Sequence, residues 1–562
     1  MANFLLPLLT TVASRVKDNF IQKTQQTCAI QEQFLRNLLS AYQATELGRT
    51  YKIGEIKSID QFRTRVPVLP YSSYELFCDR IAKGEQNILT SDRVVYLNLT
   101  SGSTSKKKLI PVTKRFQNSL RQANLTSIGF LNEELKLQGG RFGKLLATNS
   151  VQLLGTTSGG IDYGPASVGV LRMGKFAYEQ LFAHPYETLQ PKDSLARHYI
   201  CLLFALGSRN LRGIGANFPM LVLRICNYLE LYTEDLIKDL ETGKIANWLK
   251  LEPEIRALLE RRMVANPRRA AQLREIYKSN SILTPKLAWS NLSFVATARG
   301  GTSDFYFERF PTYFGDTPGF GGVYSSAEGT FSINHALNND GSILAIESGF
   351  FEFIPQDQWE AEHPQTLLAT EVKSGELYRI LVTNYSGFYR YDIGDVVEVV
   401  GFYEQAPLIV FRYRRGGLLS SNTEKTTEFH VTQVMQSLQQ KFAVVLEDFC
   451  ITLSDNTFPP CYLVNIELAL GQTLNTELVG FLTAFDLLLQ EIHTTYAIQR
   501  SDRIPSPRLR VLAPGSFAIV RQRQLLKGIP DSQLKFPHLS DDRNFLSGLK
   551  VEQEIRMRDN LD

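Results

Sequence analysis

The sequence has little cysteine, and its spacing suits neither metal binding nor redox chemistry. The chain of 562 residues contains six cysteines, and no two of them form a C-x-x-C pair. This spacing excludes zinc ribbons, iron–sulfur runs and thioredoxin-type motifs, which need such pairs. Six cysteines in so long a chain do not make a disulfide scaffold, so we expect a reducing compartment.

A surplus of one charge and long apolar runs are also missing. Lys plus Arg number 61 and Asp plus Glu 57, so the formal net charge is only +4, which argues against a nucleic-acid binder. The longest apolar stretches, at 4–13 and 478–489, are interrupted by Pro7 and Asp486. A bilayer helix needs about 18–20 apolar residues, and no basic residue precedes the first stretch as in a signal peptide. We therefore expect a cytoplasmic protein without a membrane partner.

Several well-known site motifs are absent. The chain has no G-x-x-x-x-G-K-[ST] phosphate loop, no G-x-S-x-G nucleophile elbow and no H-E-x-x-H zinc motif. Residues 213–218 begin like a dinucleotide-binding fingerprint but lack its third glycine. These absences exclude the standard P-loop, serine-hydrolase and zinc-protease classes.

The composition is that of an ordinary globular protein, with 43% hydrophobic and 21% charged residues. At about 150 residues per domain, the length predicts two or three structural units. Helical apolar spacing occurs at 27–46, 194–206 and 217–232. The segment 94–99 reads as a buried strand, and strand patterns dominate 290–415, which indicates an α/β region with mixed sheets.

Two smaller features of the first 290 residues also carry predictions. Thr113 is expected to cap the helix that follows it. The arginine-rich stretch 261–274, interrupted at Pro267, is interpreted as a solvated helical face.

The amino-acid composition changes at 414–425, which is rich in glycine and serine. The remainder predicts a compact α+β unit. Its expected elements are strands at 443–453, 461–469 and 508–512 and helices at 475–492 and 515–527. We therefore expect a large domain at 1–415, a hinge at 416–425 and a small C-terminal domain at 426–562.

A loop of hydroxyl groups follows the first predicted strand. Residues 100–105 read T-S-G-S-T-S, and Lys106, Lys107 and Lys108 come next. Backbone N–H groups and hydroxyls in such a loop can bind phosphate oxygens, and lysine adds positive charge. A polar hairpin turn with exposed lysines explains the same residues equally well.

Three further motifs carry groups that suit nucleotide chemistry. Glu328 lies in a glycine- and serine-rich turn after Tyr324, and its carboxylate suits Mg²⁺, although a surface loop explains it too. Asp395 follows Gly394 and can accept two hydrogen bonds from a vicinal diol such as ribose, or simply occupy a turn. Lys535 precedes Phe-Pro and is a candidate mobile cation.

The order of these motifs resembles the adenylate-forming superfamily, and within it the Gretchen Hagen family of acyl acid amido synthetases. The resemblance covers nearly the whole chain. The matching stretches are 62–71, 79–85, 88–91, 108–111, 324–334, 387–396, 424–426, 515–517 and 533–537. It implies an α/β fold with a large N-terminal domain of mixed β-sheets and helices and a small, mobile α+β C-terminal domain.

The resemblance implies ATP and Mg²⁺ as cofactors and a role for each matching residue. Phosphate contacts would come from Ser101, Ser103 and Thr104, with Lys108 nearby. Tyr324 and Ser325 would line the adenine pocket, Glu328 would bind Mg²⁺ or position phosphates, and Asp395 would hold the ribose. Arg414 and Lys425 would lie at the hinge, facing nucleotide or acyl group. Lys535 would meet the α-phosphate or the pyrophosphate.

The implied activity joins a small carboxylic acid to an amino acid through an acyl-adenylate. A thiol acceptor such as coenzyme A and a non-catalytic nucleotide-binding protein remain as alternatives. Ser105, Lys106 and Lys107 stand where the family has a second glycine, so they either crowd the phosphate or strengthen its binding. The stretches 160–164 and 167–172 fall where the family builds its acyl pocket, but they do not specify the acid.

Overall fold

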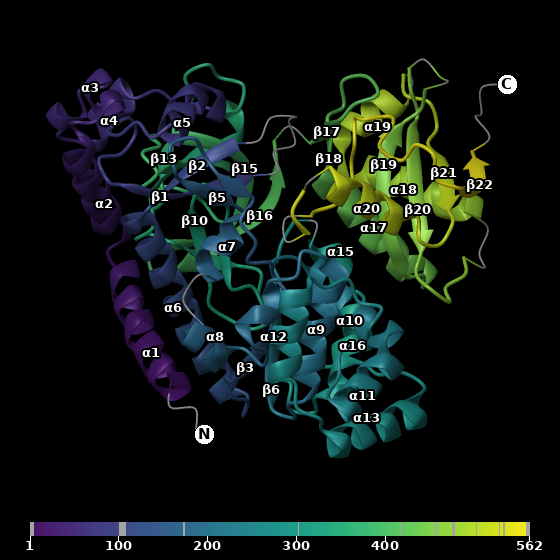
Figure 1. Ribbon diagram of the computed structural model, residues 1–562. Helices are drawn as coiled ribbons and strands as arrows, with labels where there is room; N and C mark the ends of the chain where they lie inside the picture. Colours follow the sequence, from purple (N-terminus) through teal and green to yellow (C-terminus); the bar gives the residue numbers. More distant parts are fainter. Residues whose placement is uncertain are drawn as a thin grey trace. The chain divides into compact units, whose positions relative to one another are not determined.

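The computed structural model describes residues 5–557 except 101–107, 172–174, 302, 416, 456, 458, 475–477, 502, 528 and 532–533. The chain divides into two compact units, whose elements are labelled in Figure 1. The large unit comprises Met1–Arg299, Phe310–Val410 and Asp531–Gln533. The small unit comprises Gly300–Arg309, Phe411–Pro530 and Leu534–Asp562.

The main sheet of the large unit has the strand order β13-β12-β14-β15-β16-β11-β10-β9. Its strands are β9 (Val323–Ser325), β10 (Thr330–Asn334), β11 (Ser342–Leu344), β12 (Phe350–Pro355), β13 (Leu367–Leu368), β14 (Leu377–Thr383), β15 (Tyr391–Tyr403) and β16 (Ala406–Arg414). Nearly every residue of β10, β12 and β14 is buried, so other parts of the protein cover both faces of the sheet at these strands.

Two smaller sheets complete the large unit. The first has the order β2-β1-β5-β4, with β1 (Val94–Thr100), β2 (Lys108–Thr113), β4 (Gly155–Thr156) and β5 (Asp162–Gly164). The second is parallel and has the order β3-β6-β7-β8. Its strands are β3 (Lys144–Leu146), β6 (Leu211–Gly215), β7 (Phe294–Ala296) and β8 (Gly319–Phe320).

Helices surround these sheets. They are α1 (Leu5–Thr24), α2 (Thr27–Tyr42), α3 (Glu46–Thr50), α4 (Ile59–Arg65), α5 (Glu75–Ala82), α6 (Lys114–Leu137), α7 (Ala166–Leu171), α8 (Lys175–Leu181), α9 (Ser194–Leu206), α10 (Pro219–Leu231), α11 (Thr233–Thr242), α12 (Pro253–Arg262), α13 (Pro267–Asn280), α14 (Pro285–Ala288) and α16 (Phe310–Phe314). Helix α1 packs along α6 (Figure 1). A Cβ at Gly129 of α6 would lie 2.5 Å from the Ala13 carbonyl oxygen of α1, so this close approach requires glycine.

The small unit is an α+β structure around the sheet β19-β20-β21-β22. Its strands are β17 (Leu418–Leu419), β18 (Thr426–Thr427), β19 (Leu446–Leu453), β20 (Tyr462–Leu468), β21 (Arg508–Leu512) and β22 (Val551–Arg556). Its helices are α15 (Ser303–Phe307), α17 (Glu428–Phe442), α18 (Leu478–Ile492), α19 (Thr494–Arg500) and α20 (Ser516–Leu526). The Tyr306 hydroxyl donates to Asp448 Oδ2 at 3.2 Å, which ties the segment 300–309 to this sheet.

Many predicted elements are confirmed, and so is the predicted α/β fold class with mixed sheets and an α+β C-terminal unit. Helix α9 spans the predicted residues, α10 covers most of 217–232, and β1 contains 94–99. The Thr113 side chain caps α6 by accepting a hydrogen bond from Phe116 N at 3.2 Å. Pro267 is the first residue of α13, where its missing N–H costs nothing.

The predicted solvated arginine face is wrong for Arg269. This side chain is 3% exposed and donates to the carbonyl oxygens of Leu206 and Ala288. Burial lowers its pKa to about 10. Arg262 and Arg274 form ion pairs, with Glu179 and Glu241 respectively. These three arginines therefore connect helices to one another. For Arg269, carbonyl oxygens at helix ends accept the hydrogen bonds that water would otherwise accept from the guanidinium group.

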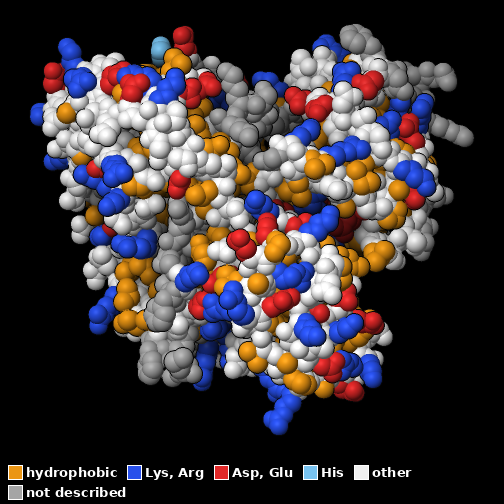
Figure 2. Space-filling view, viewed as in Figure 1, with side chains coloured by type: hydrophobic (Ala, Val, Ile, Leu, Met, Phe, Trp, Pro, Cys, Tyr) orange, Lys and Arg blue, Asp and Glu red, His pale blue; other side chains and the backbone are white. Residues whose placement is uncertain are grey.

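The visible surface matches the balanced composition. Acidic and basic side chains are interspersed over the face that Figure 2 displays. Among the described residues, no helix has the length and apolar character needed to cross a membrane.

Candidate active site

Tyr324 and Asp395, which the sequence singled out separately, are in direct contact. The Tyr324 hydroxyl donates a hydrogen bond to Asp395 Oδ2 at 2.6 Å. The Tyr324 ring stacks on Phe331, with 5.0 Å between the ring centroids. Three strands separate β9 from β15 in the sheet order, so this contact joins two strands that are not neighbours in the sheet.

Asp395 does not occupy the predicted turn. It lies within β15, where the pairing with β14 is irregular: Arg379 pairs with Val396, but Leu381 pairs with Asp392. The extra residues form a bulge, and Gly394 adopts a φ of 81° there. A bulge redirects side chains locally, and Asp395 is 1% exposed. The alternative of a simple turn aspartate is therefore wrong.

Glu328 is a buried residue, so the surface-loop alternative is wrong as well. Its side chain lies in the turn between β9 and β10, and the residue is 2% exposed. The Tyr391 hydroxyl donates to Glu328 Oε1 at 3.4 Å. The Glu328 N–H donates to Ser326 Oγ at 3.0 Å, so the turn is closed by its own serine.

Two buried amide side chains hold this turn from outside. Asn384 Nδ2 donates to the Glu328 carbonyl oxygen, and Asn98 Nδ2 donates to the Ala327 carbonyl oxygen at 2.9 Å. Sequence reasoning missed both asparagines and gave Tyr391 no role. Asn98 carried a signal, because it is a polar residue inside the apolar strand V-V-Y-L-N-L.

The hydroxyl-rich loop joins β1 to β2. Thr100 pairs with Lys108 at the two ends of this antiparallel hairpin. Ser101, Ser103 and Thr104 lie outside the described residues, as do Ser105 to Lys107. Lys108 Nζ lies 5.2 Å from the centroid of the Tyr71 ring.

Ser325 follows Tyr324 on β9 and is exposed, opposite Thr330 in the ladder. The large unit therefore brings Tyr324, Ser325, Glu328 and Asp395 into one region, around the β9–β10 hairpin. Tyrosine, carboxylate and hydroxyl groups in this arrangement can bind an aromatic base, a diol and a phosphate-bound cation.

The remaining predicted residues belong to the small unit. Arg414 is exposed at the end of β16, and Lys425 is exposed with a φ of 54°. The Lys535 side chain is 40% exposed, and its Nζ lies 3.9 Å from Glu428 Oε2. The same ammonium lies 5.6 Å from the centroid of the Phe411 ring.

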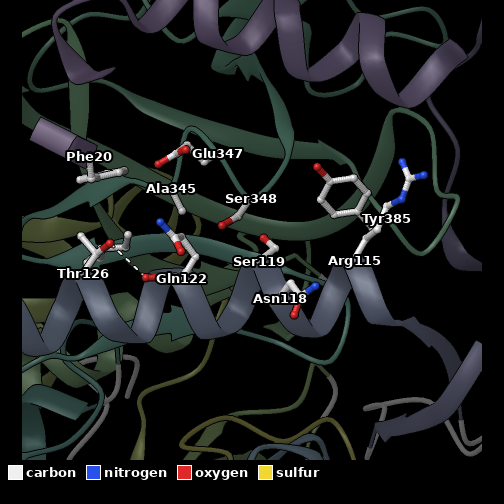
Figure 3. A pocket seen from close by; sticks show the side chains of 12 residues that line it. Phe20, Arg115, Asn118, Ser119, Gln122, Thr126, Ala345, Glu347, Ser348 and Tyr385 are labelled. Atoms are coloured by element: carbon white, nitrogen blue, oxygen red, sulfur yellow. Dashed lines mark hydrogen bonds between the residues drawn. The ribbon is translucent and has the colours of Figure 1, made fainter. Parts of the chain in front are cut away.

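A cavity of about 220 Å³ lies beside α6 and is separate from these residues. Figure 3 shows Ser119 and Ser348 between Arg115 at one end and Glu347 at the other. Arg115 forms an ion pair with Asp92 at 3.1 Å, and Glu347 pairs with Lys23. The charges at both ends are therefore already balanced by the protein, and none of the predicted site residues lines the cavity.

Comparison with protein families accounts for most of the chain. Residues 16–319 match the GH3 family N-terminal domain, residues 342–414 the GH3 family central domain and residues 429–544 the GH3 family C-terminal domain.

Individual relatives match over nearly their full length. The chain is 26% identical to a jasmonoyl–L-amino acid synthetase of Nicotiana attenuata, and the match covers 95% of each chain. It is 27% identical to an indole-3-acetic acid-amido synthetase of Arabidopsis thaliana, covering 90% of this chain and 89% of the relative.

Solved structures confirm the predicted fold. The acyl acid amido synthetase GH3.15 superimposes with a TM-score of 0.85 at 23% identity, covering 96% of this chain and 97% of that one. A 2-hydroxyisobutyryl-CoA ligase bound to an acyl-adenylate matches with a TM-score of 0.51 at 13% identity, covering 94% of this chain and 89% of that one.

Proposed function

Because the chain belongs to the GH3 family, we propose that it is an ATP-dependent acyl acid amido synthetase. It converts a small carboxylic acid to an acyl-adenylate and transfers the acyl group to the amine of an amino acid. The contact between Tyr324 and Asp395, beside the buried Glu328, is the observation that most directly supports this function. It joins three groups suited to one nucleotide within a chain whose relatives are named as amido synthetases.

In this proposal the large unit binds ATP. The Tyr324 ring, backed by Phe331, contributes to the adenine pocket next to Ser325. The Asp395 carboxylate accepts hydrogen bonds from the ribose hydroxyls, while Tyr324 fixes its orientation. Ser101, Ser103 and Thr104 bind the phosphates, with Lys108 at the end of the same hairpin.

Glu328 fits the role of a magnesium ligand. Mg²⁺ prefers oxygen and is usually held by one or two carboxylates together with substrate phosphates. Among the described residues no group of three or more His, Cys, Asp or Glu side chains forms a metal cage. A single buried carboxylate, oriented by Tyr391 and by the turn that Asn384 holds, suits a cation shared with ATP. When bound, Mg²⁺ neutralises charge on the phosphate oxygens.

The reaction has two steps. An oxygen of the substrate carboxylate attacks the α-phosphorus, and the bond from that phosphorus to the bridging oxygen breaks, so pyrophosphate leaves. The amine nitrogen then attacks the acyl carbon, AMP leaves with the electron pair of the broken bond, and the nitrogen loses a proton.

Lys535 serves the first of these steps. Negative charge builds up on phosphoryl oxygens, and a positioned ammonium stabilises it. The small unit would move relative to the large unit about a hinge at 416–425, with Arg414 and Lys425 at that hinge. Such movement lets one site carry out both steps and excludes water from the acyl-adenylate.

A pyrophosphate-release assay tests the proposal. ATP and Mg²⁺ are supplied with indole-3-acetic acid, jasmonic acid, 2,4-DB or simple aromatic and aliphatic acids, with and without an amino acid mixture. We expect release with one acid and acceleration by one amino acid. Acceleration by coenzyme A instead would indicate a thiol acceptor. No release with any acid, despite measurable ATP binding, would favour the non-catalytic alternative.

A further inference from the structure

Asp531 lies four residues before Lys535, yet it belongs to the large unit. Its carboxylate is 9% exposed and is surrounded by residues of α9 and α10. Sequence reasoning considered this segment only for its lysine. The acid makes a set of contacts that no role in nucleotide binding explains.

The contacts of Asp531 are numerous and specific. Ser194 Oγ donates to Oδ2 at 2.8 Å, and Arg197 Nη2 donates to the same oxygen at 3.1 Å. Arg224 Nη1 donates to Oδ1. His198 Nε2 lies 3.9 Å from Oδ2. One carboxylate therefore receives hydrogen bonds from a serine and two arginines that are more than 300 residues away in the sequence.

The balance of buried charge in this cluster depends on Asp531. Arg197 and Arg224 are 3% and 5% exposed, so both are cut off from water. Burial lowers the pKa of His198 to about 4, so this imidazole adds no charge at neutral pH. Although burial alone would raise it, the neighbouring positive charge of Arg224 and Arg197 lowers the pKa of Asp531. Its carboxylate therefore stays ionised and balances part of the buried positive charge.

The guanidinium of Arg224 has further bonding capacity. Its Nε and Nη2 atoms have no hydrogen-bond partner among the described residues. Arg197, by contrast, also donates to the carbonyl oxygens of Thr148 and Pro191. Removal of Asp531 would leave Arg224 buried with its main anionic partner gone, which is strongly unfavourable.

We propose that Asp531 is a positioning residue for Lys535: its ion pairs with Arg197 and Arg224 anchor the chain four residues before the lysine, and adenylation depends on this anchor. Four residues of extended chain span at most about 14 Å, so holding Asp531 limits the positions open to Lys535. The inference rests on the proposed function, in which Lys535 serves adenylation.

The kinetic test compares Asp531→Asn with Asp541→Asn, an exposed acid of the small unit. Adenylation is measured as pyrophosphate release with the acid that the screen selects. Transfer is measured separately, as amide formation from chemically prepared acyl-adenylate and amine without ATP. Small displacements of a catalytic group can cost about 100-fold, so we expect a loss of that order in adenylation kcat for Asp531→Asn.

The two steps distinguish positioning from a structural effect. We expect the KM for ATP and the transfer rate of Asp531→Asn to stay within about twofold of the control. Equal losses in both steps, or adenylation at the control rate, would overturn the proposal. Asp531→Glu keeps the charge and tests the geometry if Asp531→Asn does not fold. Its longer side chain should slow adenylation about tenfold, and a wild-type rate would likewise contradict the proposal.

A second measurement does not depend on activity. Trypsin cleaves after Lys527 and Lys535, on either side of Asp531, and we expect cleavage several-fold faster in Asp531→Asn than in Asp541→Asn without substrates. Unchanged cleavage would overturn the fixation of this segment. If the wild-type protein releases no pyrophosphate with any acid, the proposed function fails, but this comparison still decides whether Asp531 holds the segment.

Discussion

The residues assigned to nucleotide binding and the lysine assigned to catalysis differ sharply in how the protein holds them. Glu328 and Asp395 are almost fully buried, and tyrosine hydroxyls donate hydrogen bonds to both carboxylates. The Lys535 side chain is 40% exposed, and Glu428 Oε2 lies 3.9 Å from its ammonium group. An ion pair at this separation whose lysine is open to water contributes little free energy.

This difference suits the two tasks. A binding site gains affinity when its groups are already in place before the ligand arrives. A cation needed for one step of two gains from being weakly held, because its own contacts then oppose movement only slightly. Fixation of Lys535 must therefore come from the chain around it, and Asp531 is a tightly held residue close to it in sequence.

The largest effect is expected at the weakly held residue. Replacing Lys535 by alanine removes the positive charge that we propose stabilises the transition state, so adenylation should fall by about 1,000-fold or more. ATP binding should persist, because Tyr324 and Asp395 are unaffected. Pyrophosphate release and calorimetric ATP binding measure the two effects, with Lys527→Ala as the control for an exposed lysine. An unchanged release rate would remove Lys535 from the catalytic step.

Replacement of the buried Asp395 is expected to weaken ATP binding itself. Asp395→Ala removes the proposed acceptor for the ribose hydroxyls and the hydrogen bond from Tyr324. A lost charged hydrogen bond of about 1.5–3 kcal/mol corresponds to ATP binding that is weaker by about 10- to 150-fold. Calorimetry should show this weakening in Asp395→Ala and not in Asp357→Ala, an exposed acid of the same unit. Equal affinities would remove Asp395 from the ribose site.

Local sequence patterns predicted the elements that carry these residues. Apolar spacing located β1, α9 and α10, and the capping role of Thr113 followed from its position before a helix. Such features depend on neighbours within a few residues, so the sequence displays them directly.

Features that depend on distant partners were not predicted. Asp395 was assigned to a turn because the bulge in β15 exists only relative to the register of β14. Arg269 was assigned to the surface because its carbonyl partners lie on other elements. In the cluster around Asp531, the acid contacts Ser194, which lies 337 positions away in the sequence. No local sequence pattern predicts such a contact.

Acid sensitivity extends the comparison to the stability of the two units. His184 of the large unit is 2% exposed, and burial lowers its pKa to about 3. Burial, together with the smaller effect of His493, lowers the pKa of His430 in the small unit to about 3. This side chain is only half-buried. Both histidines are neutral in the folded chain at pH 5, whereas unfolded histidine takes up a proton below about pH 6.5.

The sign of the effect follows from these protons. Between about pH 6.5 and pH 3 the unfolded state binds more protons than the folded state, so stability falls as the pH falls. From pH 7 to pH 5 the burial of His184 should cost about 2 kcal/mol, and that of the half-buried His430 should cost less because water screens it. Urea unfolding at the two pH values should therefore show a weaker pH dependence in His184→Gln than in the wild type, with a smaller change in His430→Gln. If His184→Gln kept the full pH dependence, the large unit would not owe its acid sensitivity to this buried imidazole.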